Sequence, residues 1–197
     1  RELVGWQAIE ACDELLLVND SCYLVRELDG VFAKMDRTAC DWWGLQATKG
    51  IAATRHVESN RFAEKIPIDR VREALLPTFE LDYIYDFLVG SYFLGFRRQV
   101  IDDPLFRRLL SGVVAQKDKK AIIQKYEIGL THLLLSRGHA FSTFCDWLHP
   151  FHPIFSDNHF ALLREGFPVF KRYLLSDNHY HVADLVRWKD RILAIRP

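Results

Sequence analysis

The stretch Leu15-Leu16-Leu17-Val18-Asn19-Asp20-Ser21 decides the fold class of this chain. Four consecutive apolar residues end abruptly in three polar ones, which is typical of a buried strand that delivers polar groups at its carboxyl end. On either side, residues 2–11 and 28–35 have apolar side chains at helical spacing. Apolar strand runs that alternate with helical patterns indicate an α/β architecture with a mainly parallel or mixed sheet.

Further along the chain the same patterns predict two more strands, at residues 40–45 and 88–96. Helices are predicted over 68–76, from Asp103-Pro104 onward, and over 118–136, with Asp103 and Asp118 as N-caps. Residues 48–70 are predicted to form a loop or lid. Short helices are predicted at 157–164, 168–175 and 182–193. We therefore expect a single domain over 1–197, with a sheet-containing part at 1–145 and a helical segment at 146–197.

Composition excludes several classes of protein. The chain has 197 residues, of which 49% are hydrophobic and 26% charged, so it is globular and not disordered. Its 26 basic residues balance 26 acidic ones, which gives no electrostatic case for nucleic acid as the main partner. No apolar run approaches the roughly 20 residues of a membrane helix.

Motifs exclude further classes. The four cysteines show no C-x-x-C spacing, which gives no support to a zinc ribbon or a thioredoxin-like site. Walker loops, G-x-S-x-G elements and dinucleotide fingerprints are absent from the sequence, so kinase, hydrolase and dehydrogenase functions have no positive support. We expect buried free thiols in a reducing cytoplasm.

The first candidate site is Asn19-Asp20-Ser21. Ligands of open α/β sheets bind beyond the carboxyl ends of strands, and a carboxylate there could hold Mg²⁺ or Mn²⁺ against a substrate diphosphate. An Asx turn or a helix N-cap that simply closes the strand explains the same three residues equally well.

The second candidate is Glu127, which lies in an apolar helical pattern two residues before Gly129. Glycine within a helix costs about 1 kcal/mol relative to alanine, so Gly129 indicates close approach of another group. Glu127 could act as a general base on an acceptor hydroxyl. An exposed carboxylate that pairs with Lys120, Gln124 or Thr131 is the simpler alternative.

Other polar and aromatic clusters have simple explanations too. His149 and His152 are three residues apart, but no acidic residue completes a zinc signature, so surface or hydrogen-bonded histidines are the alternative to a metal site. Pairs such as Lys119-Lys120 could contact anions or could form a solvated helix face. Trp42-Trp43, Tyr92-Phe93 and Trp147 could stack on sugars or could belong to the core.

Seven short motifs, in order along nearly the whole chain, resemble the rhamnan synthesis F family of bacterial polysaccharide glycosyltransferases. They read Arg1-Glu2 with Trp6, Asn19-Asp20-Ser21, Phe32-Ala33-Lys34-Met35, Cys40-Asp41-Trp42-Trp43-Gly44-Leu45, Ser91-Tyr92-Phe93, Tyr126-Glu127-Ile128-Gly129-Leu130 and Gly166-Phe167-Pro168-Val169-Phe170-Lys171-Arg172. Each motif is weak alone, whereas seven in a fixed order are fairly specific.

The resemblance implies a GT-A-like, inverting, metal-dependent transferase that moves a sugar such as rhamnose from a nucleotide-diphospho sugar to a growing cell-surface polysaccharide or lipid-linked acceptor. On that basis Asp20 would hold Mg²⁺ or Mn²⁺ at the diphosphate, and Glu127 would deprotonate the acceptor. Asp41 becomes a pocket residue, and Lys171 and Arg172 become diphosphate contacts. The remaining substrate-binding residues implied by the motifs are Glu2, Asn19, Ser21, Trp43, Ser91 and Tyr92.

The resemblance also implies a cytoplasmic protein at the inner face of the membrane, because the acceptors of this family are usually lipid-linked. A GT-A domain has nucleotide-binding strands before its metal aspartate, and only about eighteen residues precede Asp20, so we expect a fragment of a larger transferase that lacks those strands. Two alternatives remain: a non-catalytic carbohydrate-binding or scaffold module, and a different metal enzyme built on the histidines.

Overall fold

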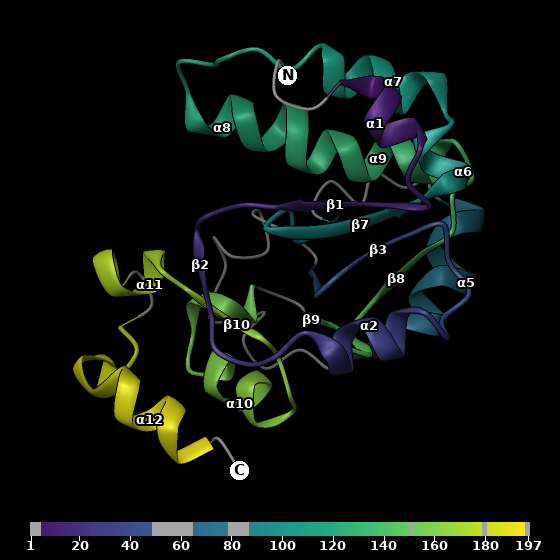
Figure 1. The fold of residues 1–197 in the computed structure, drawn as a ribbon. Helices are drawn as coiled ribbons and strands as arrows, with labels where there is room; N and C mark the ends of the chain where they lie inside the picture. The colour runs from purple at the N-terminus through teal and green to yellow at the C-terminus, as the bar shows by residue number, and fades with distance from the viewer. Residues whose placement is uncertain (1–4, 49–64, 79–86, 150–151, 179–180, 196–197) are drawn as a thin grey trace.

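The central element of the fold is a four-stranded mixed sheet (Figure 1). Its order is β1 (Glu14–Val18), β7 (Phe93–Arg97), β3 (Trp42–Gly44) and β8 (Phe141–Thr143). The β1–β7 and β7–β3 pairs are antiparallel and the β3–β8 pair is parallel, which confirms the predicted α/β class with a mixed sheet. The structure, a computed structural model, describes residues 5–48, 65–78, 87–149, 152–178 and 181–195.

Two smaller sheets accompany the central one. The first has the order β5 (Ile66–Pro67), β9 (Trp147–His149), β4 (Ala47–Thr48) and β6 (Leu88–Val89). The second pairs β10 (Val169–Lys171) with β2 (Cys22–Leu24) in antiparallel register. Strands β9 and β10 lie within 146–197, so this segment contributes strands as well as helices.

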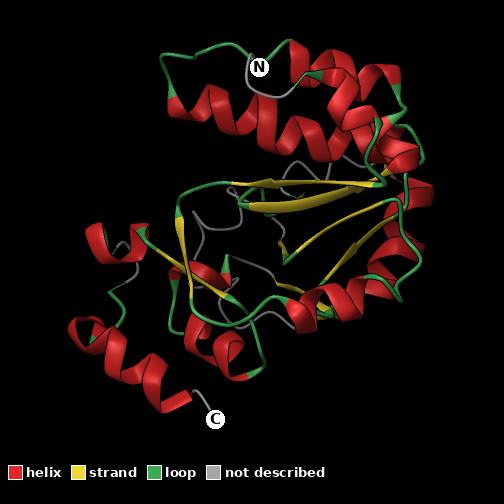
Figure 2. Ribbon diagram, in the orientation of Figure 1, coloured by secondary structure: helices red, strands yellow, loops and turns green. Residues whose placement is uncertain are grey.

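Helices cover both faces of the central sheet and one end of the molecule (Figure 2). On one side lie α1 (Trp6–Glu10), α6 (Arg98–Ile101), α7 (Pro104–Ser111), α8 (Lys119–Ile122) and α9 (Gly129–Ser136). The others are α2 (Asp29–Met35), α5 (Ile68–Thr78), α10 (Asn158–Arg164), α11 (Tyr173–Ser176) and α12 (Trp188–Ile195), with short 3₁₀ turns at Pro153–Phe155 and Leu185–Arg187. No helix among the described residues combines the length and apolarity needed to cross a membrane.

Three sequence predictions are wrong in detail. Strand β1 is not fully buried: it lies at a sheet edge, where Leu16 and Val18 are exposed while Leu15 and Leu17 pack inward. The predicted strand 88–96 is two strands, β6 and β7, which belong to different sheets. Residues 168–175 form β10 followed by the short helix α11, not one helix. Most of the predicted loop at 48–70 lies outside the described residues.

The turn between β6 and β7 depends on glycine. A Cβ at Gly90 would lie 2.4 Å from Cε1 of Tyr92, so only glycine lets the Tyr92 ring fold back over this turn. The Gly90 N–H donates to the Gln46 carbonyl at 2.9 Å, which holds the turn against the chain before β4. The strand run therefore breaks at Gly90, and Ser91 and Tyr92 are placed at the edge of the central sheet.

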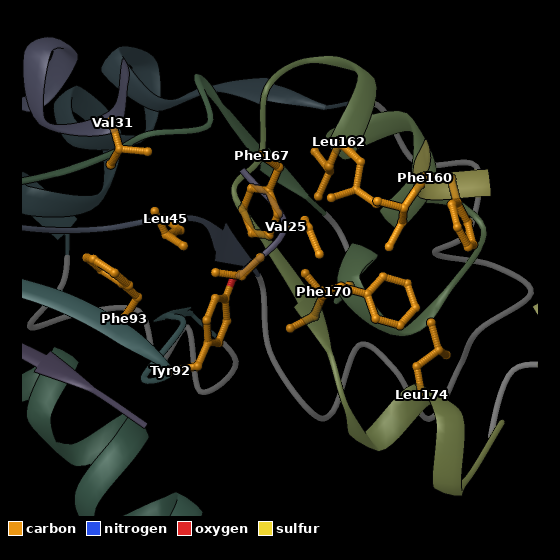
Figure 3. Close-up of a cluster of buried hydrophobic side chains, with 14 of the residues drawn as sticks. Val25, Val31, Leu45, Tyr92, Phe93, Phe160, Leu162, Phe167, Phe170 and Leu174 are labelled. Atoms are coloured by element: carbon orange, nitrogen blue, oxygen red, sulfur yellow. The ribbon is translucent and has the colours of Figure 1, made fainter. Parts of the chain in front are cut away.

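Side chains of the central sheet alternate between two hydrophobic cores. Trp42, Leu94 and Phe96 face the core shared with α6, α7 and α9, whereas Trp43 and Phe93 face the core shared with β10 and α10. Figure 3 shows the second core, in which Tyr92 lies between Phe93 and Phe170. The central sheet is thus covered on both faces.

The predicted helix 118–136 is present but not uniform. Asp118 accepts a hydrogen bond from the Lys120 N–H at 2.9 Å, which confirms it as N-cap. Between α8 and α9, residues Ile123–Ile128 form a π-helix, and the Gly129 N–H donates to the Gln124 carbonyl five residues back. A Cβ at Gly129 would lie 3.1 Å from that carbonyl oxygen, so the close approach predicted for Gly129 comes from its own helix. Single π turns occur frequently at functional sites.

Asp103 ties three elements together. Its carboxylate caps α7 through the Leu105 N–H at 2.8 Å, accepts from Arg137 Nε at 2.9 Å and lies 3.0 Å from His139 Nε2. Burial raises the pKa of Asp103, but the hydrogen bonds from Arg137, His139 and Leu105 outweigh it and lower the pKa from 3.8 to about 2.

Replacing Asp103 by Asn should lower the free energy of unfolding by about 1–3 kcal/mol at pH 7, because hydrogen bonds to a charged group are lost. Because folding lowers this pKa, the stabilisation is present above about pH 4 and is lost as the pH falls toward about 2. Urea unfolding at several pH values measures this loss. Asp118→Asn, at an exposed cap, should cost less; an equal and pH-independent loss for both variants would contradict the explanation.

Candidate functional site

A pocket of about 480 Å³ lies where the chain leaves β1, enters β7 and leaves β10. It brings together six residues that the sequence analysis assigned to the site: Asn19, Ser21, Ser91, Tyr92, Glu127 and Lys171. The remaining lining residues are Leu88, Gly90, Lys119, Ile123, His152, Ile154, Phe155 and Tyr173. Residues as far apart in the chain as Asn19 and Tyr173 therefore share one cavity.

Antiparallel pairing of β1 with β7 explains why the Asn-Asp-Ser and Ser-Tyr-Phe motifs meet. The end of β1 lies beside the start of β7, and the Asn19 N–H donates to the Tyr92 carbonyl at 3.2 Å. Asn19 Oδ1 in turn accepts from the Ser21 N–H at 3.1 Å, so the strand does end in an Asx turn. The Asx turn that was the alternative explanation of this motif is therefore present, and Asn19 and Ser21 of the turn line the pocket.

The end of β10 docks on this turn. The Arg172 N–H donates to the Ser21 carbonyl at 2.9 Å, and Lys171 Nζ donates to Ser21 Oγ at 2.5 Å. The Lys171 ammonium also lies 5.1 Å from the centroid of the Tyr92 ring. Lys171 is thereby held at the pocket wall by contacts with both predicted motifs.

Positive charge dominates the pocket. Burial lowers the pKa of Lys171; the nearby Cys22 and Glu127 act in the opposite direction, and Lys119 lowers it further. The Lys119 ammonium lies 4.8 Å from the centroid of the Tyr173 ring, at the same cavity. Two ammonium groups against the single carboxylate of Glu127 favour an anionic ligand.

Two residues that line the pocket each carry a buried polar atom with no hydrogen-bond partner among the described residues: Tyr92 Oη, which points into the hydrophobic core (Figure 3), and His152 Nδ1. Burial raises the pKa of Tyr92, so its hydroxyl stays protonated. Burial and, secondarily, the Lys171 charge lower the pKa of His152 to about 4, so its ring is neutral at pH 7. Unpartnered buried polar atoms are costly, but both atoms are closed off from the cavity, so they do not by themselves indicate a ligand.

Glu127 reaches the pocket from the π-helical segment. It is half-buried and lines the cavity together with Ile123 of the same segment. Of its predicted partners, Thr131 donates its hydroxyl to the Glu127 backbone carbonyl at 3.4 Å, which leaves the carboxylate out of that bond. Glu127 is the single carboxylate among the residues that line this pocket.

Asp20 does not line the pocket. Its side chain is 99% exposed, and one carboxylate oxygen lies 3.8 Å from Arg172 Nη1, which also donates to the Asp20 carbonyl at 2.8 Å. No group of three or more His, Cys, Asp or Glu residues gathers into a metal site within the described ranges. Divalent ions need several oxygen ligands, so the described residues do not fit a metal site at Asp20. The roles predicted for Asp20 and Mg²⁺ or Mn²⁺ stay predictions.

The structure does not bring the other predicted residues into the pocket. Asp41 precedes β3 and accepts from the Ala140 N–H at 2.8 Å, at the end of the sheet opposite Tyr92. Trp43 is fully buried, and its Nε1–H donates to Glu14 at 2.7 Å. Arg172 lies beside Asp20 and Tyr23, outside the cavity. Glu2 lies outside the described residues.

Two aromatic pocket residues, Phe155 and Tyr173, escaped the sequence analysis. Their rings meet edge to face with centroids 6.0 Å apart, and both line the cavity. Nothing in their spacing separates them from core aromatics, so no local signal could have identified them. His152 and Lys119, by contrast, belonged to clusters that the sequence singled out, although for a metal and for a general anion contact.

Two other histidines, His149 and His159, are buried in the interior of the protein. His149 is buried in β9, and His159 is fully buried, stacks on Phe170 with centroids 4.7 Å apart and donates to the Val169 carbonyl at 3.0 Å. Burial lowers the pKa of both rings to about 4, so both are neutral at pH 7. Neither lines the pocket.

Comparison with known proteins gives one match. The model of the Rhamnan synthesis protein F family matches residues 1–188, which is nearly the whole chain. Neither the curated proteins nor the solved structures contain a match. The predicted GT-A-like assignment and the predicted loss of N-terminal strands therefore stay predictions. The family match agrees with the seven ordered motifs: this chain belongs to the Rhamnan synthesis protein F family, which suggests a role in the synthesis of rhamnan polysaccharide.

Proposed function

We propose that this chain is a glycosyltransferase, or part of one, that transfers a sugar from a nucleotide-diphospho sugar to a growing cell-surface polysaccharide. Rhamnose is the donor sugar that the family description favours. The observation that carries the proposal is the pocket itself, which combines two ammonium groups with one carboxylate. This set matches the chemical needs of a diphosphate leaving group and a hydroxyl nucleophile.

Lys171 and Lys119 would hold the diphosphate. Charge-assisted hydrogen bonds from ammonium groups to phosphate oxygens are stronger than neutral ones, and partial burial of Lys171 strengthens them further. When the bond between the anomeric carbon and the diphosphate oxygen breaks, the electron pair leaves with the diphosphate. The two cations stabilise the charge that develops there.

Glu127 would be the general base. As the acceptor hydroxyl attacks the anomeric carbon from the face opposite the diphosphate, its proton passes to the Glu127 carboxylate. One such displacement inverts the anomeric configuration. The site then resets when Glu127 releases the proton to solvent after the product leaves. Asn19, Ser21 and Ser91 would orient the sugar through hydrogen bonds at the pocket wall.

The step that we propose for these residues uses protein groups alone. Arginine and lysine clamps can replace a metal at a transferring phosphate group, and here Arg172 occupies the neighbourhood of the one predicted ligand, Asp20. We therefore derive no step through Mg²⁺ or Mn²⁺. Any metal role of Asp20 would require ligands from outside the described residues.

The acceptor that we propose is a growing polysaccharide or a lipid-linked glycan. We place the reaction in the cytoplasm, at the inner face of the cytoplasmic membrane, where a lipid-linked acceptor and a nucleotide-sugar donor are both present. A non-catalytic carbohydrate-binding module is the alternative. The exposed position of Asp20 favours this alternative, since a transferase of the predicted metal-dependent type would use that residue.

Lys171→Met tests the donor site, because it removes the charge and keeps the buried stem. Calorimetric titration with a panel of nucleoside diphosphates should show a Kd raised about 10- to 100-fold, as expected for the loss of a charge-assisted hydrogen bond. Lys189→Met, at an exposed lysine outside the pocket, is the matched control and should bind normally.

The titration also separates the alternatives. Wild-type binding that persists with EDTA supports the cation clamp, whereas binding that requires Mn²⁺ means that further ligands complete a metal site with Asp20. A chain that binds glycans but no nucleotide, alone or with more of its protein attached, would contradict the transferase proposal and favour the non-catalytic module.

A further inference from the structure

One segment of this neutral chain carries a local excess of positive charge. Residues 107–125 contain Arg107, Arg108, Lys117, Lys119, Lys120 and Lys125 against Asp118 alone. Glu10 forms an ion pair with Arg107, which leaves an excess of four positive charges in a chain whose total is zero. Among the described residues, none of the other five cations has a carboxylate at ion-pair distance.

The same segment exposes apolar side chains. Val113 and Val114 lie in the connection between α7 and α8 and are 41% and 53% exposed, and Ile122 of α8 is 38% exposed. Figure 1 shows that this connection forms an outer corner of the molecule, on the side of α7, α8 and α9. Exposed valines among lysines on a protruding segment are typical of interaction sites.

The valines are held in place by hydrogen bonds. The Val114 N–H donates to Tyr126 Oη at 3.0 Å, and Gln116 Nε2 donates to the same oxygen at 3.3 Å. Tyr126 belongs to the π-helical segment, so these hydrogen bonds attach the connection to that helix. Because backbone contacts tie the connection down, the structure presents the valine side chains outward in a defined position.

We propose that this surface, the docking loop of residues 112–120 with the flanking cations Arg108 and Lys125, binds an anionic lipid bilayer. Basic residues near a membrane surface gain about 1 kcal/mol each from anionic headgroups, and Val113 and Val114 would enter the headgroup region. A solvated helix face needs no exposed valines, and a nucleic-acid surface would pair its cations with aromatic or polar base contacts. The combination of cations with aliphatic side chains matches lipid best.

The docking loop also borders the candidate pocket. Lys119 belongs to both, because it lines the cavity beside Tyr173. A protein docked through this loop would hold its pocket close to the bilayer surface, where a lipid-linked acceptor presents its glycan. The inference gives the proposed membrane association a specific surface, yet it does not rest on the transfer reaction, because bilayer binding needs no sugar donor.

Vesicle flotation of the purified chain tests the proposal. Wild-type protein should bind vesicles of phosphatidylglycerol and phosphatidylcholine in equal parts, and should bind pure phosphatidylcholine far more weakly. The triple variant Lys117→Gln, Lys120→Gln, Lys125→Gln should lose about 100-fold in partitioning, at roughly fivefold for each cation. These three lysines do not line the pocket, so nucleotide binding should stay unchanged.

The matched control removes three exposed cations elsewhere: Arg70→Gln, Arg164→Gln and Lys189→Gln. It changes the net charge equally and should keep wild-type partitioning. The double variant Val113→Ser, Val114→Ser should bind at least tenfold more weakly, because it removes apolar contact and leaves the charge intact. Thermal unfolding of each variant verifies that the fold is retained.

Three outcomes would overturn the proposal. The first is no binding of wild-type protein to the anionic vesicles, and the second is an equal loss in the control triple variant. The third is tighter binding to single-stranded polyuridylate that the two serine substitutions leave unchanged, which would assign the surface to nucleic acid. None of these results depends on whether the pocket binds nucleotides, so the two proposals fail separately.

Discussion

Replacing Glu127 by Gln should reduce the rate of sugar transfer about 100- to 10,000-fold, the usual range for removing a general base. The amide keeps the size of the side chain and its place beside Ile123 in the pocket but cannot accept the acceptor's proton. Because we propose that Lys171 and Lys119 bind the donor phosphates, we expect the affinity for the nucleotide to change little. Initial rates of transfer, measured with full-length protein, should therefore fall through kcat.

Glu73→Gln is the matched control. Glu73 is exposed on α5 and does not line the pocket, so its substitution should leave the rate within about twofold, as usual for surface changes. Transfer by Glu127→Gln at the wild-type rate would remove Glu127 from the mechanism. A loss of donor affinity with unchanged kcat would instead assign Glu127 to binding.

Phe170→Ala should lower the free energy of unfolding by about 3–5 kcal/mol, the usual cost of truncating a buried phenylalanine. Phe170 is fully buried, and its ring stacks on His159 and Trp188 with centroids 4.7 Å and 5.0 Å away. It also precedes Lys171 in β10, so the cavity left behind should loosen the strand that carries the pocket cation. Urea unfolding measures the first effect and nucleotide titration the second.

Tyr23→Ala provides the comparison. Tyr23 also stacks on Trp188, with centroids 5.7 Å apart, but it is 44% exposed, so its loss should cost clearly less than that of Phe170. Equal losses for the two variants would mean that the aromatic stack is not organised around Phe170. An unchanged nucleotide affinity in Phe170→Ala would show that Lys171 does not depend on this core.

Local signals predicted much of the fold. The caps at Asp103 and Asp118 and the helices α2, α7 and α10 follow from side-chain chemistry within a few residues, and the structure confirms them. The strand pairing could not be predicted in this way, because it depends on partners far along the chain. The exposure of Leu16 and Val18 follows from the position of β1 at a sheet edge, which its own apolar run does not reveal.

The candidate site, like the fold, could be predicted from the sequence only in part. The resemblance to the family, carried by the ordered motifs, implied that Asn19, Tyr92, Glu127 and Lys171 belong to one functional set, and the structure brings all four to one pocket. It could not distinguish Trp43, a core residue, from a ligand contact, because stacking on a sugar and stacking in a core use the same side chain. The π-helical register that presents Glu127 also has no signature beyond the nearby glycine.

The hydrogen bond between Lys171 and Ser21 has a consequence for how this protein acquires its activity. The two residues are 150 positions apart, and the Asn19–Tyr92 contact spans most of the first half of the chain. Contacts at such sequence separation form late in folding, because a long loop must close first. The pocket therefore comes into existence only when both ends of the chain have met. A nucleotide that contacts both parts of the chain would bind only the folded protein. It would therefore lengthen the lifetime of the folded state, and more so at higher nucleotide concentration.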